Sequence, residues 1–374
     1  KQKQKFKLII IGCLPQLEKE NLLIQYPQID GIFGISDYPK ITKFLKNIQQ
    51  KNNLKSSVSR KIIEISSQES FLPSCRIPRV LSTPKSYAYL KIADGCDNKC
   101  AYCLIPTIRG NYRERPIEDI VKEAENIVNC GVKELILISH DTTLYGIKIY
   151  KKQMLHRLIK ELSKIKNLLW IRILYTHPAN FYDELVSEIK ENKKFCRYLD
   201  IPIQHTSDKI LSLMERKITR KQIFNLIDKL KKQIPDITLR TTIIVGFPKE
   251  KDDDFKILLN DIKNLEFDWL GCFMYSEQKN TKAEKLSPKV DNNTKKQRLD
   301  EIIRIQQKIT YQKNKSRVGK IYKILVDKEN FGHTEFQCPE VDGKTYFLNP
   351  AKNLVEEIRI KNVNNIYDLE GEIL

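Results

Sequence analysis

Between residues 84 and 314 the chain alternates between short apolar runs and amphipathic stretches, and this alternation limits its fold more than any other feature. The apolar runs have the length of strands, and the stretches between them have the periodicity of helices. Such alternation indicates βα units around a parallel sheet, here an α/β fold of the partial (β/α)6 barrel type. The predicted strands are Tyr87–Ile92, Glu134–Ile138, Leu169–Leu174, Tyr198–Ile203, Thr238–Val245 and Trp269–Phe273.

Two helices between these strands are predicted most clearly. The stretch Ile117–Cys130 follows Pro116 and ends before Gly131, an arrangement typical of helix ends. The stretch Ile223–Gln233 has Thr219 upstream as a candidate cap and a proline just beyond it.

The regions on either side differ in character. Residues 1–83 begin with a predicted strand at Phe6–Ile11 and end in polar and proline-rich stretches, 51–70 and 73–84, which we interpret as a linker. Residues 315–374 contain short alternating runs that predict a small β-barrel. Its predicted strands are Ile321–Val326, Thr334–Phe336, Thr345–Leu348 and Val355–Ile360. Because the chain starts at Lys1 with a strand almost at once, we expect it to be a fragment that lacks an upstream segment.

Composition narrows the class of protein. No apolar run approaches the roughly 20 residues of a membrane span, and the apolar run near the N-terminus is too short for a signal peptide, so a cytoplasmic protein is expected. The nine cysteines favour reduced thiols, some of them metal ligands, over a disulfide scaffold. The net charge of +19 suggests a polyanionic or ribosomal setting, although lysine-rich usage throughout the chain explains it equally well.

Three cysteines stand close together directly after the first strand of the series. Cys96, Cys100 and Cys103 have the spacing C-x3-C-x2-C. Three thiolates can hold a [4Fe–4S] cluster and leave one iron without a protein ligand, and an open metal position is a reactive one. A zinc site would favour paired C-x2-C units and four ligands, which the sequence lacks nearby. We therefore favour a catalytic iron–sulfur site over zinc or chance clustering.

The cysteine spacing, with Tyr102 before the third cysteine, resembles the signature of the radical S-adenosylmethionine (SAM) superfamily. The continuation Leu104-Ile105-Pro106, Arg109-Gly110 and Arg115-Pro116 is similar to the methylthiotransferases, which insert a methylthio group at an unactivated carbon. Further segments resemble the branch that modifies an aspartate of ribosomal protein S-twelve rather than tRNA. These segments are 139–146, 199–205, 271–276, 332–336 and 339–343.

This resemblance implies a reaction and its cofactors. One SAM supplies the methyl group, a second yields a 5′-deoxyadenosyl radical at the first cluster, and an auxiliary [4Fe–4S] cluster delivers sulfur. The radical removes hydrogen from the β-carbon of the aspartate. Ribosomal protein S-twelve or the small ribosomal subunit is the implied partner, and a reduced flavodoxin or ferredoxin the electron donor. The alternatives are the same chemistry on a tRNA adenosine, or an iron–sulfur protein that binds nucleic acid without catalysis.

The resemblance also suggests site residues. Cys13, in Gly12-Cys13-Leu14-Pro15-Gln16, looks like the last cysteine of the auxiliary-cluster set, of which relatives carry two more upstream. The candidate cofactor-binding residues are Tyr102, Asp141, Gln204, Arg240 and Gly246, and His205 is a candidate second-layer or substrate contact. The remaining cysteines are expected to be structural; they are Cys75, Cys130, Cys196, Cys272 and Cys338.

The C-terminal barrel, which resembles a TRAM domain, bears on the choice of substrate. Residues 316–374 hold eight Lys or Arg and ten Asp or Glu, a net charge of −2 in a chain of +19. Because an RNA-binding surface is expected to be basic, this charge favours a basic protein substrate. We predict that Glu335, Glu340 and Asp342 face that substrate; the alternative is that they are solvated turn residues.

Two positions depart from the family pattern. His140 stands where the family usually has glutamine. Lys249, in Gly246-Phe247-Pro248-Lys249-Glu250, stands where it usually has glycine, which puts the backbone geometry of this loop in question.

Overall fold

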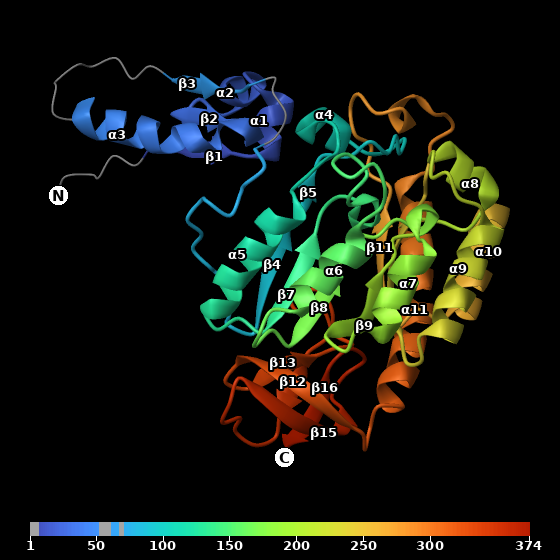
Figure 1. Cartoon of the computed structure of the whole chain (residues 1–374). Helices are drawn as coiled ribbons and strands as arrows, with labels where there is room; N and C mark the ends of the chain where they lie inside the picture. Colours follow the sequence, from blue (N-terminus) through green and yellow to red (C-terminus); the bar gives the residue numbers. More distant parts are fainter. Residues whose placement is uncertain (1–6, 52–60, 67–70) are drawn as a thin grey trace, which may run out of the picture. The chain divides into compact units, whose positions relative to one another are not determined.

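The computed structural model describes residues 7–51, 61–66 and 71–374 (Figure 1). The chain forms two compact units. The first contains Lys1–Pro73, Asp94–Asn98 and Leu104–Arg113. The second contains Ser74–Ala93, Lys99–Cys103 and Glu114–Leu374. The division passes through the cysteine loop, so that loop contributes residues to both units.

The first unit is built on a small parallel sheet of order β1-β2-β3 (Ile9–Ile11, Gly31–Phe33, Ile62–Glu64). Its helices are α1 (Cys13–Glu18), α2 (Asn21–Gln25), the 3-10 helix η1 (Ile35–Lys40) and α3 (Ile41–Lys51). The first strand was predicted at Phe6–Ile11. In the described residues, which begin at residue 7, it covers Ile9–Ile11. Strand β3 lies inside the stretch 51–70 that we interpreted as a linker, and that interpretation is wrong for Ile62–Glu64, because Ile62 and Ile63 pair with β2. Residues 52–60 and 67–70 of the same stretch lie outside the described part.

The second unit contains the predicted parallel sheet, with strand order β11-β10-β9-β8-β7-β4. The strands are β4 (Tyr87–Lys91), β7 (Glu134–Ile138), β8 (Trp170–Ile173), β9 (Phe195–Asp200), β10 (Thr238–Val245) and β11 (Trp269–Met274). In the ranges that the structure describes, the edge strands β4 and β11 do not pair with each other, so the sheet is an open partial barrel, as predicted.

One strand of this sheet is displaced from its prediction. The pattern predicted Tyr198–Ile203, whereas β9 covers Phe195–Asp200. Pro202 has no N–H to donate, and Gln204 has a φ of 68°, so regular pairing ends before them. Phe195 and the next residue are buried, which places the start of the strand earlier.

Helices cover the outer face of the sheet (Figure 1). They are α5 (Ile117–Asn129), α6 (Leu155–Ser163), α7 (Asp183–Glu191), α8 (Asp208–Leu213), α9 (Arg220–Gln233), α10 (Asp252–Leu265) and α11 (Asn292–Lys315). The predicted cap of α9 is confirmed: the Thr219 hydroxyl accepts from the Gln222 N–H, and the Gln222 side chain accepts from the Thr219 N–H. Short 3-10 helices lie in three of the loops, at Thr142–Leu144, Pro178–Asn180 and Ala283–Lys285.

The C-terminal region is a closed barrel of order β12-β13-β14-β16-β15, which confirms the predicted small β-barrel. Its strands are β12 (Ile321–Lys328), β13 (Phe331–Thr334), β14 (Thr345–Phe347), β15 (Val355–Val363) and β16 (Leu369–Ile373). The prediction placed the second strand too late, at Thr334–Phe336. It missed β16, in which Leu369 and Ile373 are buried but the residues between them include two glutamates and a glycine.

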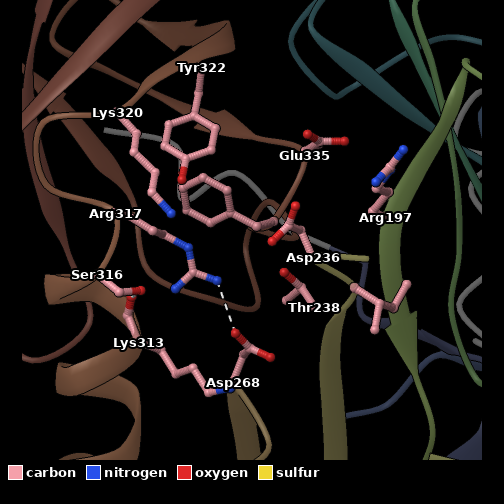
Figure 2. A pocket seen from close by; sticks show the side chains of 12 residues that line it. Arg197, Asp236, Thr238, Asp268, Lys313, Ser316, Arg317, Lys320, Tyr322 and Glu335 are labelled. Carbon is pink, nitrogen blue, oxygen red and sulfur yellow. Dashed lines mark hydrogen bonds and ion pairs between the residues drawn. The ribbon is translucent and has the colours of Figure 1, made fainter. Parts of the chain in front are cut away.

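This barrel lies at the N-terminal ends of the parallel strands, seen below them in Figure 1. The Trp269 indole N–H at the start of β11 donates to the Phe336 carbonyl over 2.9 Å. A cavity of about 380 Å³ lies at the junction, and Figure 2 shows Arg317 directed at Asp268, to which it donates over 2.9 Å. The barrel therefore does not cover the carboxyl ends of the strands, which lie at the opposite edge of the sheet.

Among the described residues, none of the helices combines the length and the apolar composition that crossing a membrane requires.

Candidate active site

The cysteine loop begins at the carboxyl end of the first strand of the sheet. Two short strands, β5 (Ala93–Asp94) and β6 (Arg113–Glu114), pair at its base, and helix α4 (Ile105–Arg109) lies within it. Cys96 is buried, and its N–H donates to the Gly110 carbonyl over 3.2 Å. Gly95 has a φ of 74°, and a Cβ there would lie 2.1 Å from the Asn111 carbonyl oxygen, so only glycine fits this turn.

Residues Lys99–Cys103 of the cysteine loop belong to the second unit. The Ala101 N–H donates to the Met214 carbonyl over 3.0 Å and fixes the loop beside α8. Arg216, almost fully buried, lies 3.6 Å from the Cys100 sulfur through Nη1. Tyr102 packs edge-on against Phe247 with 6.5 Å between ring centroids, and burial raises the pKa of its hydroxyl.

The donor set of this loop fits an iron–sulfur cluster with one open iron. The loop supplies three cysteine thiols, and the sequence between Cys96 and Cys103 contains no cysteine other than Cys100. Within the described ranges, no three His, Cys, Asp or Glu side chains are gathered in metal-binding geometry. The fit therefore rests on the thiols, their spacing and their place after β4, rather than on a preformed cage.

Cys13 is the first residue of α1 and directly follows β1 and Gly12, as predicted for a residue at a strand's carboxyl end. Its side chain is exposed. Within the same unit, Arg109 lies 3.5 Å from the Cys13 sulfur through Nη2 and 3.0 Å from Asp94 Oδ2 through Nη1. In the sequence Arg109 stands out only as part of a family motif, and no local pattern indicates its contact with Cys13.

Two candidate cofactor residues, Asp141 after β7 and Gln204 after β9, differ in how many hydrogen bonds their side chains make. The buried Asp141 carboxylate accepts from the Thr143 hydroxyl over 2.5 Å and from the Asn180 amide over 2.9 Å. Gln204 is half-buried, and within the described structure its Oε1 accepts no hydrogen bond. Gln204 therefore offers a free acceptor, whereas the Asp141 carboxylate already orders its own loop.

The loop after β10 needs unusual backbone at two positions. Gly246 has a φ of 70°, and a Cβ there would lie 2.2 Å from Cγ of Lys295 on α11. Lys249 has a φ of 69°, so this lysine keeps the left-handed backbone that glycine adopts easily. Its N–H donates to the Pro288 carbonyl over 2.9 Å. The departure from the family pattern therefore leaves the backbone geometry of the loop possible, at a cost in strain.

His205 lies in the core beneath this loop and has no exposed surface. Its Nδ1 accepts from the Ser207 N–H over 2.9 Å, and burial lowers its pKa to about 3. The imidazole is therefore neutral, and the carboxylate of Glu250, 3.9 Å from Nε2, is not its ion-pair partner. This environment suits a residue that supports the loop more than one that touches a substrate.

Arg240 lies in the N-terminal half of β10, on the side of the C-terminal barrel. Its guanidinium lies 2.8 Å from Asp200 Oδ1 and 3.5 Å from Asp342 Oδ1. The Asp342 carboxylate also accepts from the Tyr198 hydroxyl over 2.7 Å, and its side chain is 2% exposed. Burial raises the pKa of Asp342 to about 6.

The three acidic residues predicted to meet the substrate thus occupy different environments. Asp342 pairs with Arg240 and Tyr198 inside the junction, and its role toward the substrate remains a prediction. Glu340 is exposed and accepts from the Tyr89 hydroxyl over 3.1 Å, and Glu335 is half-buried. The roles of Glu335 and Glu340 remain predictions.

The cysteines expected to be structural occupy ordinary positions. Cys196 and Cys338 are buried in one apolar cluster at the junction, where burial raises the pKa of both thiols. Cys272 lies in β11 and Cys130 follows the last residue of α5. The Cys75 N–H donates to Asp119 over 2.9 Å.

Tyr175 lies just beyond the carboxyl end of β8 and is not among the site residues that the sequence predicted. It has a φ of 58° and is 48% exposed. Its N–H donates to Asp200 Oδ2 over 2.9 Å, and its carbonyl accepts from the Thr142 N–H over 3.1 Å. A bulky residue held in the left-handed region is uncommon and typical of functional sites. No sequence pattern indicates such a backbone conformation.

Known proteins resemble the chain over nearly its whole length. Models of the Radical SAM superfamily and the TRAM domain match residues 90–262 and 318–374. The chain is 42% identical over 376 residues to the ribosomal protein uS12 methylthiotransferase RimO of Acetivibrio thermocellus, covering 98% of this chain and 82% of that protein. It is 43% identical over 381 residues to the protein of the same name from Clostridium botulinum, covering 100% of this chain and 83% of that protein.

A solved structure supports the fold alone. The apo form of the cobalamin-dependent S-adenosylmethionine radical enzyme OxsB aligns with a TM-score of 0.50 at 13% identity, covering 79% of this chain and 43% of that one. The similarity in sequence to the methylthiotransferases is far higher and extends through both matched domains. The chain therefore belongs to the ribosomal protein uS12 methylthiotransferase family of radical SAM enzymes.

Proposed function

We propose that this chain is a radical SAM methylthiotransferase that adds a methylthio group to the β-carbon of an aspartate in ribosomal protein uS12. The observation that carries the proposal is the cysteine loop of Cys96, Cys100 and Cys103 at the carboxyl end of β4, in a chain more than 40% identical to uS12 methylthiotransferases over nearly its whole length. When bound, the cluster supplies the electron that cleaves SAM.

The chain's own residues have separate tasks in this reaction. The three thiolates hold the cluster, and Arg216 donates a hydrogen bond to the Cys100 sulfur. Gln204 Oε1 accepts from an N–H or O–H of SAM, because it is a buried acceptor with no partner in the described structure. Phe247 is fully buried in an apolar cluster behind Tyr102, and this cluster keeps water from that side of the loop.

A second cluster is part of the proposal. Cys13 supplies one of its ligands, at the end of β1 in the first unit. Such a cluster needs further thiolate ligands besides Cys13. A reduced flavodoxin or ferredoxin supplies electrons.

The choice of a protein substrate over tRNA rests on charge. The C-terminal barrel has a net charge of −2 over residues 316–374, and an acidic surface repels a phosphate backbone while it attracts a basic ribosomal protein. Of the predicted acidic set, Glu340 is exposed, Glu335 is half-buried and the Asp342 side chain is 2% exposed, so Glu340 and Glu335 are the more accessible to such a substrate.

The substrate is tested with the full-length protein, reconstituted without oxygen and supplied with SAM and a reductant. Ribosomal protein uS12 and tRNA are offered in parallel, and the intact mass of each is measured. We expect uS12 to gain one methylthio group and tRNA to stay unchanged. If tRNA gains a methylthio group and uS12 does not, the substrate is tRNA and the proposal of uS12 is wrong.

The ligand assignment is tested by iron content and 5′-deoxyadenosine release. This chain should bind about four irons and cleave SAM without transferring sulfur, because Cys13 alone cannot hold a second cluster. Replacing Cys96, Cys100 or Cys103 with alanine should abolish both iron binding and 5′-deoxyadenosine. Cys130→Ala, at the exposed end of α5, is the matched control and should change neither. Retained cleavage in a loop variant would disprove the assignment.

A further inference from the structure

Tyr175 has no task in the function proposed above, although its backbone is unusual. It lies two residues beyond β8, has a φ of 58° and keeps its side chain half-exposed. The left-handed region is unfavourable for a bulky side chain. Residues in such conformations persist only where the surrounding structure holds them, and they cluster at active sites.

Hydrogen bonds on both sides hold the backbone of Tyr175. Its N–H donates to Asp200 Oδ2 over 2.9 Å, and its carbonyl accepts from the Thr142 N–H over 3.1 Å. Asp200 is itself fixed, because its side chain is 2% exposed and its Oδ1 accepts from Arg240 Nη1 over 2.8 Å. Thr142 follows β7, Asp200 ends β9 and Arg240 lies in β10, so three other strands contribute to holding this one residue.

The place of Tyr175 is that of a substrate contact. The strands of the sheet are parallel, so their carboxyl ends share one edge, and in barrel enzymes this edge carries the active site. Residues Lys99–Cys103 of the cysteine loop follow β4 at this edge, and Tyr175 follows β8. The C-terminal barrel lies at the opposite edge (Figure 1).

The hydroxyl of Tyr175 is a neutral hydrogen-bond donor. Burial and the Asp200 carboxylate raise its pKa, whereas Arg240 acts in the opposite direction. The hydroxyl therefore keeps its proton at neutral pH. Within the described structure it donates to no other residue. Such a donor suits an ionised acceptor, because hydrogen bonds to charged groups are stronger than those between neutral groups.

We propose that Tyr175 is a substrate-binding residue whose hydroxyl donates a hydrogen bond to the carboxylate of the aspartate that is modified in uS12. The inference rests on the proposed function, since it takes the target to be an aspartate side chain of a protein. A fixed carboxylate also fixes the adjacent β-carbon, from which hydrogen is removed. The strained backbone holds the donor in place for this contact.

The test uses the full-length protein with both clusters bound, supplied with SAM, a reductant and uS12. The kcat and the KM for uS12 are measured for the unchanged protein, Tyr175→Phe and Tyr175→Asn. Phenylalanine removes the hydroxyl alone, and asparagine removes the ring but tolerates the left-handed backbone. Tyr311→Phe is the matched control, because Tyr311 is a partly exposed tyrosine of α11.

We expect Tyr175→Phe to raise the KM for uS12 about tenfold, because a hydrogen bond to a charged acceptor is lost. Tyr175→Asn should raise it further, and Tyr311→Phe should leave it unchanged. Release of 5′-deoxyadenosine from SAM without uS12 should stay the same in every variant, since Tyr175 acts on the substrate and not on the cofactor.

A second form of the substrate identifies the acceptor. In this form the modified aspartate of uS12 is replaced by asparagine, and its inhibition of the reaction is measured with the unchanged protein and with Tyr175→Phe. Because an amide oxygen is neutral, loss of the hydroxyl should weaken this inhibition less than about threefold. A tenfold loss with the asparagine form as well would place the hydroxyl on another group of the substrate and overturn the inference.

An unchanged KM in Tyr175→Phe would also overturn the inference. The same holds for a fall in 5′-deoxyadenosine release without uS12, because Tyr175 would then belong to the cofactor site. Failure of the proposed function looks different: the unchanged protein itself would leave uS12 unmodified, and the inference would fail with it.

Discussion

Arg172 and Glu134 form an ion pair in which neither side chain is exposed, with 2.6 Å between Arg172 Nε and Glu134 Oε1. Glu134 is the first residue of β7 and Arg172 lies within β8, and both side chains contact the C-terminal barrel. Arg172 also donates to the Glu335 carbonyl over 2.8 Å, and Glu134 lies 2.7 Å from His333 Nε2. One buried pair from the parallel sheet thus binds the barrel at two points.

Removing the arginine of this pair should destabilise the protein. Arg172→Met leaves the Glu134 carboxylate buried without its main partner, so we expect the free energy of unfolding to fall by about 3 kcal/mol. Denaturation by urea measures the change. Arg157→Met removes an exposed pair with Glu161 and should cost less than about 1 kcal/mol. Equal effects of the two substitutions would contradict the structural role of Arg172.

Stability should depend on pH through His333. Burial acts to lower the pKa of His333, but Glu134 and Asp327 outweigh it and raise the pKa from 6.5 to about 8. Because the folded pKa exceeds the unfolded one, the stabilisation is fully present below about pH 6.5 and is lost as the pH rises through about 8. The loss should reach about 2 kcal/mol.

Urea denaturation between pH 6 and 9 tests this dependence. His333→Gln, which keeps a polar side chain but cannot be charged, should flatten the profile in this range. A profile for the unchanged protein that is already flat would show that His333 does not bind its extra proton in the folded state.

The loop after β10 offers a substitution that should stabilise the protein. Lys249 adopts a φ of 69°, which costs a non-glycine residue about 1 kcal/mol. Lys249→Gly relieves this strain, but glycine also gains entropy in the unfolded chain, which offsets part of the gain. We therefore expect the free energy of unfolding to rise by only several tenths of a kcal/mol. Calorimetry measures the change in melting temperature, and a decrease would contradict the assigned conformation.

Gly246 in the same loop should not tolerate a side chain. Gly246→Ala places a Cβ 2.2 Å from Lys295 Cγ at a φ of 70°, so we expect a loss of about 2 kcal/mol in stability. Adding Lys295→Ala should recover the part due to the clash and leave the backbone strain. If the double variant recovers nothing, contact with Lys295 is not the reason for glycine here.

Much of the parallel sheet could be predicted because its strands are buried apolar runs between clear helix signals. The ranges predicted for β7 and β10 match the structure at both ends. Short strands could not be predicted in the same way. β3 has only two isoleucines in a polar stretch, and the buried residues of β16 are separated by glutamates, so partners elsewhere in the chain define both.

The candidate site likewise has one part that the sequence predicts and another that it does not. The cysteine spacing is local, and sequence alone identifies it. The Arg109–Cys13 contact joins residues 96 positions apart, and the His333–Glu134 contact joins residues 199 positions apart. Such contacts depend on the fold, so the sequence alone does not indicate that Asp342 and Arg240 lie together at the junction.

The most direct test of the account follows the hydrogen that the radical removes. Full-length enzyme with both clusters is incubated with SAM, a reductant and ribosomal protein uS12 whose aspartates carry deuterium on the β-carbon. We predict that deuterium appears in 5′-deoxyadenosine and that one aspartate of uS12 gains a methylthio group. Release of 5′-deoxyadenosine without deuterium, with uS12 unchanged in mass, would contradict the central claim that this chain modifies an aspartate of uS12.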